Sequence, residues 1–417
     1  MVAVSLSCGD SDPSDGGQDA TTSSSATGDS GATDTSEDGT TGVGTSGDSG
    51  PASTSGDDTS GGSTSGDSGP ASTSGDDTSD GGTTGGDTAG ADTTGADTGD
   101  DAPDPPCSWD QGTPGQTVSL QTTYDGETRS FELHLPTDYD CTPRPVVVGL
   151  HGYYGSGAGF QSSTSQMTDR IDELGYIGIF PDGLPMGMGW QAAVTSFNDI
   201  DSHNSAGPDG PTCTMNAYDY DVYDNCPPEE GDDACNWGTS CADDEGFIRT
   251  LLQTSFTEWS GDAAQVLLTG FSQGGQSAQS LAWRLADVVT VAAPHHGFSA
   301  NGYTQAPPSK MSLFQVWATG DDVVNGGEVP SSDGMIYDGA DETALVWANG
   351  QSCDTATTPY PTAFDGTQGW ACSEHANCQT QAQVVNCVWQ GGHTWGRIPG
   401  TNFALEAMLS FFAAQAP

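Results

Sequence analysis

The chain has 417 residues, with 58 Asp and Glu against 7 Lys and Arg and a formal net charge of −51. This charge argues against nucleic acids and anionic membrane surfaces as partners. The length allows one large domain or two smaller ones.

A cysteine follows the short apolar start of the chain. The residues "MVAVSLS" before Cys8 resemble the end of a bacterial lipoprotein signal, although Leu6 stands two residues before the cysteine rather than three. We expect residues 1–8 to be the remnant of such a signal and Cys8 to carry lipid; a chance match is the alternative. No other segment approaches the ~20 apolar residues of a membrane span, so we expect membrane contact only through this anchor, at the cell surface or after secretion.

Residues 9–106 consist almost wholly of Gly, Ser, Thr, Asp, Ala and Pro, without an aromatic residue. The segment "SGDSGPASTSGDDTS" begins at Ser46 and again at Ser65, but it has no apolar face on which a solenoid could stack. Such a composition cannot bury enough apolar surface to offset the entropy of ordering. We predict a disordered acidic linker, followed by one folded domain over residues 107–417.

Ten of the eleven cysteines lie in that folded domain. Their even number fits five disulfides formed in an oxidising, extracytoplasmic compartment. Their spacing, without any CxxC, argues against zinc, and we expect no metal or cofactor. Four cysteines fall in an acidic insertion, 199–242, that disulfides would pin. A calcium site there is an open alternative, although the spacing fits no EF-hand. Its acids are Asp199, Asp201, Asp219, Asp221 and Asp224.

From residue 128 onward, expected strands alternate with expected helices. A hairpin or edge strand is expected at 128–136, and short apolar runs typical of buried strands follow at 144–152 and 176–183. Further strands are expected at 264–270 and 312–320. The expected helices are 167–175, 243–258, 273–286 and 402–415. This alternation predicts an α/β fold with a mostly parallel, doubly wound sheet.

The run "GFSQGG" lies between a predicted strand and a predicted helix, and it matches G-x-S-x-G around Ser272. In a nucleophile elbow the serine sits on a sharp turn, and flanking glycines are needed because a Cβ would clash with the adjoining strand and helix. A Gly-rich turn formed by chance is the alternative. The strand before and the helix after favour the nucleophile.

A serine nucleophile needs a base, and in this fold class the order along the chain is serine, acid, histidine. His393 follows the apolar run "QVVNCVW" in a Gly-bounded loop and is the predicted base. Asp321 follows the strand at 312–320 and is the predicted acid, with Asp322 as the alternative. The other histidines after the serine are interpreted as wall, packing or loop residues: His295, His296 and His375.

Two backbone N–H groups are needed for an oxyanion hole. Gln273, directly after the serine, is one predicted donor; Tyr153, in "GLHGYYGSG", is the other. Tyr153, Tyr154, Trp190 and Trp395 are expected beside the site, where they can stack on an aromatic acyl group or form ordinary rim packing.

With these pieces in order, the chain from about residue 128 to the C-terminus resembles secreted esterases of the polyhydroxybutyrate depolymerase and feruloyl esterase type. The resemblance rests on "DGETRSFELHLP", "RPVVVGLHG", "FPDGLPMGMGW", "DDEGFIRTLL", "GFSQGG", "DDVV" and "GGHTW". It implies an α/β-hydrolase with a Ser272–Asp321–His393 triad. It also suggests that Cys353 pairs with Cys378, which leaves Cys372 and Cys387 as another pair.

The leading hypothesis is therefore an extracellular, monomeric carboxylic-ester hydrolase that forms an acyl-enzyme. Its expected substrates are feruloyl or acetyl esters of plant cell walls, or polyhydroxyalkanoate-type polyesters. One alternative is a serine peptidase of the prolyl-oligopeptidase type, although no propeller or gating domain is evident. Another is a non-catalytic surface protein that binds carbohydrate.

Overall fold

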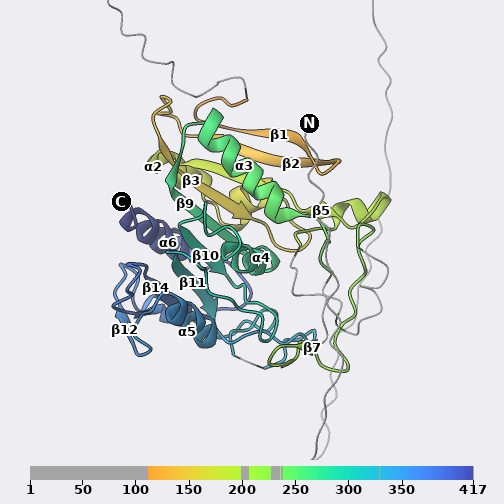
Figure 1. Ribbon diagram of the computed structural model, residues 1–417, viewed down its shortest axis with the longest axis vertical. Helices are drawn as coiled ribbons and strands as arrows, with labels where there is room; N and C mark the ends of the chain where they lie inside the picture. Colours follow the sequence, from red (N-terminus) through yellow and green to blue (C-terminus); the bar gives the residue numbers. More distant parts are fainter. Residues whose placement is uncertain (1–110, 199–205, 227–234, 236–237, 328, 417) are drawn as a thin grey trace, which may run out of the picture. The chain divides into compact units, whose positions relative to one another are not determined.

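One sheet carries the predicted strands, with parallel strands at its centre and antiparallel strands at both edges. The computed structural model describes residues 111–198, 206–226, 235, 238–327 and 329–416 (Figure 1). Within them, the sheet has the order β1 (Gln116–Tyr124), β2 (Glu127–Leu135), β4 (Ile177–Pro181), β3 (Arg144–Leu150), β9 (Gly261–Phe271), β10 (Val291–His295), β11 (Ser312–Ala318), β14 (Val384–Trp389), β13 (Ala371–His375) and β12 (Thr357–Tyr360). The predictions for residues 1–8, including Cys8, and for the linker lie outside the described residues.

The six strands from β4 to β14 run parallel. The predicted mostly parallel sheet is thus confirmed. β2 pairs antiparallel with both β1 and β4, as expected for a hairpin strand. At the other edge, β12 and β13 extend the sheet antiparallel from β14, a pairing that the sequence analysis did not foresee.

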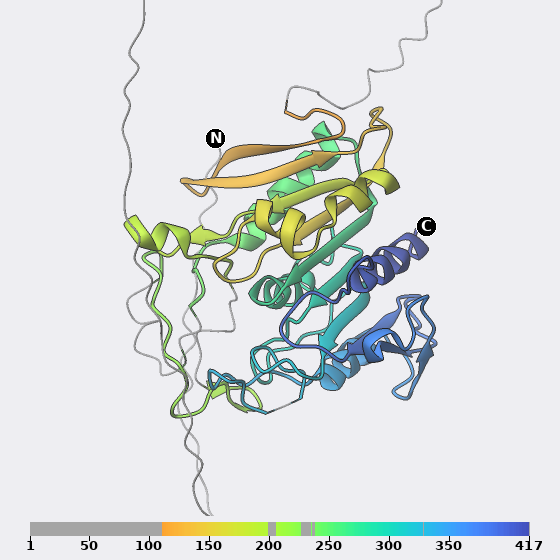
Figure 2. The same cartoon turned by 180° about the vertical axis from the view of Figure 1, so that it is seen from behind.

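Helices cover both faces of the sheet. The α- and π-helical segments are α1 (Gly157–Gly159), η1 (Phe160–Thr164, one π-helical turn), α2 (Thr168–Leu174), α3 (Asp244–Glu258), α4 (Gln273–Ala282), α5 (Ala340–Gly350) and α6 (Phe403–Ala414). The apolar residues of α3, α4 and α5 pack in one core cluster on one face, and those of α2 and α6 pack in a second cluster on the other. Figure 1 shows α3, α4 and α5 toward the viewer, and Figure 2 shows α2 and α6.

The remaining short elements lie in the connections. They are the 3₁₀ turns η2 (Gly189–Ala193) and η4 (Thr367–Gly369) and the ribbon strands β5 (Leu184–Pro185), β6 (Thr195–Ser196), β7 (Ala206–Gly207) and β8 (Gly210–Pro211). No helix in the described part of the chain is long and apolar enough to cross a membrane.

The helix boundaries follow the local signals in the sequence. Gly175 ends α2 with φ 72°, a left-handed conformation that glycine adopts without a steric penalty. Asp243 precedes α3, and its side chain accepts a hydrogen bond from the N–H of Gly246. α4 is shorter than predicted, because it ends at Ala282 and the chain continues in turns.

Disulfides fix the insertion and the antiparallel edge. Cys213–Cys235 and Cys226–Cys241 close two loops within the insertion, as expected. Cys353–Cys378 and Cys372–Cys387, the pairs suggested by the resemblance, are both present. Cys141 is disulfide-bonded as well.

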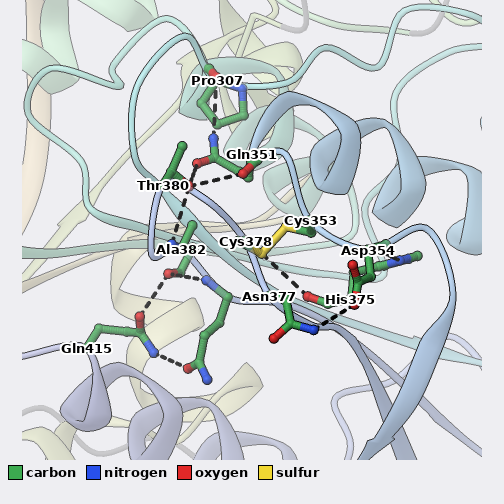
Figure 3. Close-up of a disulfide and its surroundings, with 12 residues drawn as sticks. Pro307, Gln351, Cys353, Asp354, His375, Asn377, Cys378, Thr380, Ala382 and Gln415 are labelled. Carbon is green, nitrogen blue, oxygen red and sulfur yellow. Dashed lines mark hydrogen bonds between the residues drawn. A yellow bond between two sulfur atoms is a disulfide. The ribbon is translucent and has the colours of Figure 1, made fainter.

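The Cys353–Cys378 bond joins the segment that follows α5 to the loop after β13 (Figure 3). Hydrogen bonds surround it: Thr380 donates to the Gln351 side chain at 2.6 Å, and Asn377 donates to Asp354 at 2.7 Å. The disulfide and these contacts tie the loop between β13 and β14 to α5.

Candidate active site

Ser272 occupies a strained turn between β9 and α4. Its backbone has φ 57° and ψ −128°, an unusual conformation for a residue with a side chain. A Cβ on Gly270 would lie 2.1 Å from the Gly274 carbonyl oxygen, and one on Gly274 would lie 2.3 Å from the Leu150 carbonyl oxygen. Only glycine fits at either position, so the predicted elbow geometry and its physical reason are both observed.

The structure brings the three predicted triad residues together in one hydrogen-bonded chain. The Ser272 Oγ lies 2.8 Å from Nε2 of His393, and Nδ1 of His393 lies 2.9 Å from Oδ2 of Asp321. The ionised carboxylate can only accept, so Nδ1 carries the proton and Nε2 is left to accept from the serine hydroxyl. The arrangement can therefore remove a proton from Ser272 Oγ.

Asp321 is held on both of its oxygens. Its Oδ1 accepts from the backbone N–H groups of Val323 and Val324, at 2.9 and 3.0 Å. Burial raises the pKa of this carboxyl, but hydrogen bonds from His296 and His393 outweigh burial and hold the pKa well below its usual range. Asp321 is thus anionic at neutral pH. Asp322, the alternative acid, is exposed.

His296, interpreted from the sequence as a wall or packing residue, lies against the candidate acid. Its Nδ1 lies 2.5 Å from Oδ2 of Asp321, the same oxygen that His393 contacts. The ring is fully buried, and burial lowers its pKa in spite of the carboxylate. His296 follows β10, and this strand pairs with β9 so that both end at the same edge of the sheet as the serine. That adjacency was the signal available in the sequence.

His295 and Trp395 support the loop that carries His393. The two rings stack with centroids 4.1 Å apart at 13°, and Nε2 of His295 accepts from the N–H of Gly396 at 3.3 Å. Trp395 is only 3% exposed. The expectation that it lines a substrate pocket is therefore wrong, because its ring is turned into the core by this stacking.

The two predicted oxyanion donors flank the serine. Among the described residues, no protein acceptor takes the backbone N–H of Tyr153 or of Gln273, so both are available to a ligand oxygen. Gly152, next to Tyr153, approaches Ser272 so closely that a Cβ would lie 3.2 Å from the serine Cβ. The Gln273 side chain donates to the Phe197 carbonyl at 2.7 Å and so anchors the elbow to the segment after β6.

His151 braces this loop and is not placed to act as a base. Its Nδ1 donates to the Gly152 carbonyl at 2.7 Å, and its Nε2 accepts from the Gly183 N–H at 2.9 Å. Burial lowers the pKa of His151 to about 4, so the ring stays neutral at neutral pH. His375, in β13, contacts the Asp354 carbonyl far along the sheet.

The aromatic residues expected at the rim differ in their placement. Tyr153 lines both cavities that border Ser272, and the centroid of its ring lies 4.7 Å from that of Tyr154. Tyr154 is 58% exposed and has φ 63°. The side chain of Trp190 lies outside the described parts of the structure.

A metal-type grouping is present, but hydrogen bonds already account for it. Among the described residues, one group has side-chain atoms that could bind a metal and that all lie within 4.8 Å of one another. It consists of His296, Asp321 and His393. The Nδ1 atoms of both histidines already form hydrogen bonds with Oδ2 of Asp321. Of the acids considered for calcium, Asp199 and Asp201 lie outside the described residues.

Comparison with known proteins gives one significant sequence relative. No protein-family model matches the chain. Feruloyl esterase B from Piromyces equi is 24% identical over 258 residues, which cover 60% of this chain and 39% of that protein. The chain thus matches about two fifths of the length of this curated relative.

Solved structures give weaker similarities. Acetyl xylan esterase from Aspergillus awamori has a TM-score of 0.46 and 14% identity, covering 71% of this chain and 99% of that one. The Bacillus cereus carboxylesterase has a TM-score of 0.39 and 15% identity, covering 69% and 94%.

The strand order, the elbow at the end of β9 and the sequence relative agree with the resemblance found in the motifs. The chain has the α/β-hydrolase fold, with Ser272 on the elbow between β9 and α4.

Proposed function

We propose that the protein hydrolyses carboxylic esters through an acyl-enzyme formed on Ser272. The observation that carries the proposal is the hydrogen-bonded chain from Ser272 through His393 to Asp321, at the end of a strained elbow. The relative's name, feruloyl esterase, supports an ester as the substrate.

In the first half-reaction, Ser272 Oγ attacks the ester carbonyl carbon while Nε2 of His393 takes the hydroxyl proton. The carbonyl oxygen becomes an oxyanion that accepts from the N–H groups of Tyr153 and Gln273. When the intermediate collapses, the bond to the alcohol oxygen breaks and His393 gives its proton to that oxygen. Asp321 holds the Nδ1 proton throughout and stabilises the imidazolium.

In the second half-reaction, water repeats these steps against the acyl-enzyme. His393 takes a proton from the water as the water oxygen bonds to the carbonyl carbon. When the second tetrahedral intermediate collapses, the bond to Ser272 Oγ breaks and His393 gives its proton to that oxygen. The serine recovers its proton, and the acid product leaves. The acid carries a negative charge at neutral pH.

We further propose that the enzyme works outside the cytoplasm, on feruloyl or acetyl esters of plant cell-wall polymers or on polyhydroxyalkanoate-type polyesters. Disulfides throughout the described domain support an oxidising compartment. Attachment through a lipid on Cys8 remains part of this proposal.

The test is steady-state hydrolysis of p-nitrophenyl acetate by the purified wild type and Ser272→Ala. We expect the variant to lose at least about 10³-fold in kcat while its melting temperature changes little, because the reacting oxygen is removed. Hydrolysis by Ser272→Ala at the wild-type rate would refute the mechanism.

A further inference from the structure

Ser272 borders two cavities of different size. The inner cavity, of about 120 Å³, is lined among others by Tyr153, Gln273, Val324, Met335 and Tyr337. The outer groove, of about 440 Å³, also borders the serine and is lined among others by Phe160, Phe271 and His393. Because Ser272 lines both cavities, an ester attacked by its Oγ can place one half in each cavity.

The position of His393 decides which half of the ester lies where. The base must return its proton to the leaving alcohol oxygen, so that oxygen must come within hydrogen-bond reach of Nε2. His393 borders the outer groove and is not among the residues that line the inner cavity. The alcohol half therefore lies in the outer groove, and the acyl half points toward the inner cavity.

The size of the inner cavity limits the acyl group. An engineered protein cavity of about 150 Å³ holds one benzene molecule, and the inner cavity is smaller. A feruloyl group adds a propenoyl arm, a methoxy group and a hydroxyl to such a ring. An acetyl or butyryl group needs only a fraction of that volume.

The walls of this cavity are braced against expansion. Val324 and Met335 are fully buried, and Met335 forms a backbone bridge with Cys213, whose disulfide anchors it to Cys235. Tyr220 and Asp333 also line this cavity, and the hydroxyl of Tyr220 donates a hydrogen bond to the Asp333 carboxylate at 2.8 Å. At the end of the cavity that these residues close, a larger acyl group would have to displace groups that are held by these contacts.

We propose that this enzyme takes esters of short acyl groups, from acetyl to about butyryl, joined to a large alcohol such as a sugar of a polymer. The acyl group occupies the inner cavity and the alcohol occupies the outer groove. This assignment rests on the proposed ester hydrolysis at Ser272, and it selects the short acyl groups from the substrates considered there.

The test compares kcat/KM for p-nitrophenyl acetate, butyrate, hexanoate and octanoate, which share one leaving group, and for methyl acetate against methyl ferulate. We expect a maximum between acetate and butyrate and a fall of at least about tenfold at octanoate, because packed walls resist added methylenes. Methyl acetate should exceed methyl ferulate. A wild type that hydrolyses octanoate as fast as acetate, or that prefers methyl ferulate, would overturn the proposal.

Cavity variants identify the wall. Met335→Ala should move the optimum toward longer chains, whereas Met188→Ala, at a residue that is 86% exposed and does not line the cavity, should leave it unchanged. Val324→Ala is a second enlarging variant if Met335→Ala folds poorly. An unchanged chain-length profile in a folded enlarging variant would contradict the assignment. A fluorophosphonate probe separates the two levels: if it labels Ser272 but long acyl groups are preferred, only the cavity assignment fails; without labelling or turnover, the proposed ester hydrolysis itself fails.

Discussion

Replacing Asp321 with asparagine tests the candidate triad without changing its shape. The two backbone N–H groups of Val323 and Val324 fix an acceptor at Oδ1, so the asparagine carbonyl oxygen must occupy that position. Its NH₂ group then faces Nδ1 of His393, which must accept and so carry its proton on Nε2. That proton points at Ser272 Oγ, and the ring can no longer take the serine proton.

The expected loss is large because the tautomer is wrong rather than merely less favourable. In a serine protease, the same change in an equivalent acid lowers kcat by about 10⁴-fold. We expect about 10³–10⁴-fold for Asp321→Asn, equal to about 4–5.5 kcal/mol of lost transition-state stabilisation. The assay is kcat for p-nitrophenyl acetate, with circular dichroism to establish that the variant is folded.

Asp322→Asn is the matched control, since it makes the same chemical change on the adjacent, exposed side chain. Its kcat should stay within about twofold of wild type, because no catalytic hydrogen bond is altered. The reasoning would be refuted if folded Asp321→Asn kept a tenth of wild-type activity, or if the two variants lost activity equally.

Three further changes should affect stability in defined ways. The pKa of Asp321 is lower in the folded state, so its ionisation contributes to the free energy of unfolding above its unfolded pKa of about 4, and this contribution is lost as pH falls toward the folded value. In urea denaturation at a series of falling pH values, the free energy of unfolding should therefore fall less steeply with pH for Asp321→Asn than for wild type. The same pH dependence in both proteins would count against the lowered pKa. Replacing Cys372 and Cys387 by serine should lower the unfolding free energy by about 2–4 kcal/mol, seen as a lower melting temperature; an unchanged melting temperature would show that the bond adds nothing. Asp244→Ala should cost about 3–5 kcal/mol because it leaves a buried arginine unpaired, whereas Asp287→Ala, in an exposed pair, should cost less than about 1 kcal/mol; equal costs in urea denaturation would contradict the role of burial.

The elbow was predictable because its signal in the sequence is local. Gly270 closely approaches Gly274 within the strand–helix junction, whereas Gly274 closely approaches Leu150 of β3, but the sequence shows both glycines and the junction. The choice between Asp321 and Asp322 was not local. It depends on which side chain turns inward to the imidazoles, and that follows from the packing of the loop after β11.

Two residues, His296 and Trp395, were interpreted wrongly because the direction of a side chain depends on packing between distant parts of the chain. His296 and Trp395 have the expected chain positions, but their ring directions are set by partners distant in sequence. His296 turns toward Asp321 from the neighbouring strand, and Trp395 turns onto His295. Periodicity and motif spacing locate a backbone; they do not report such contacts. The strands β12 and β13 were not predicted because they are short and largely polar, and so lack the apolar pattern that identifies a strand in the sequence.

The central claim is that Ser272 is the nucleophile, and covalent labelling tests it most directly. The full-length protein is treated with a fluorophosphonate probe at neutral pH, and the adduct is mapped by peptide mass spectrometry in wild type and in Ser272→Ala. We predict a single adduct on Ser272, loss of ester hydrolysis in proportion to labelling, and no adduct in the variant. A wild type that remains unlabelled while hydrolysing esters, or an adduct on another residue that accounts for the loss of activity, would contradict the account.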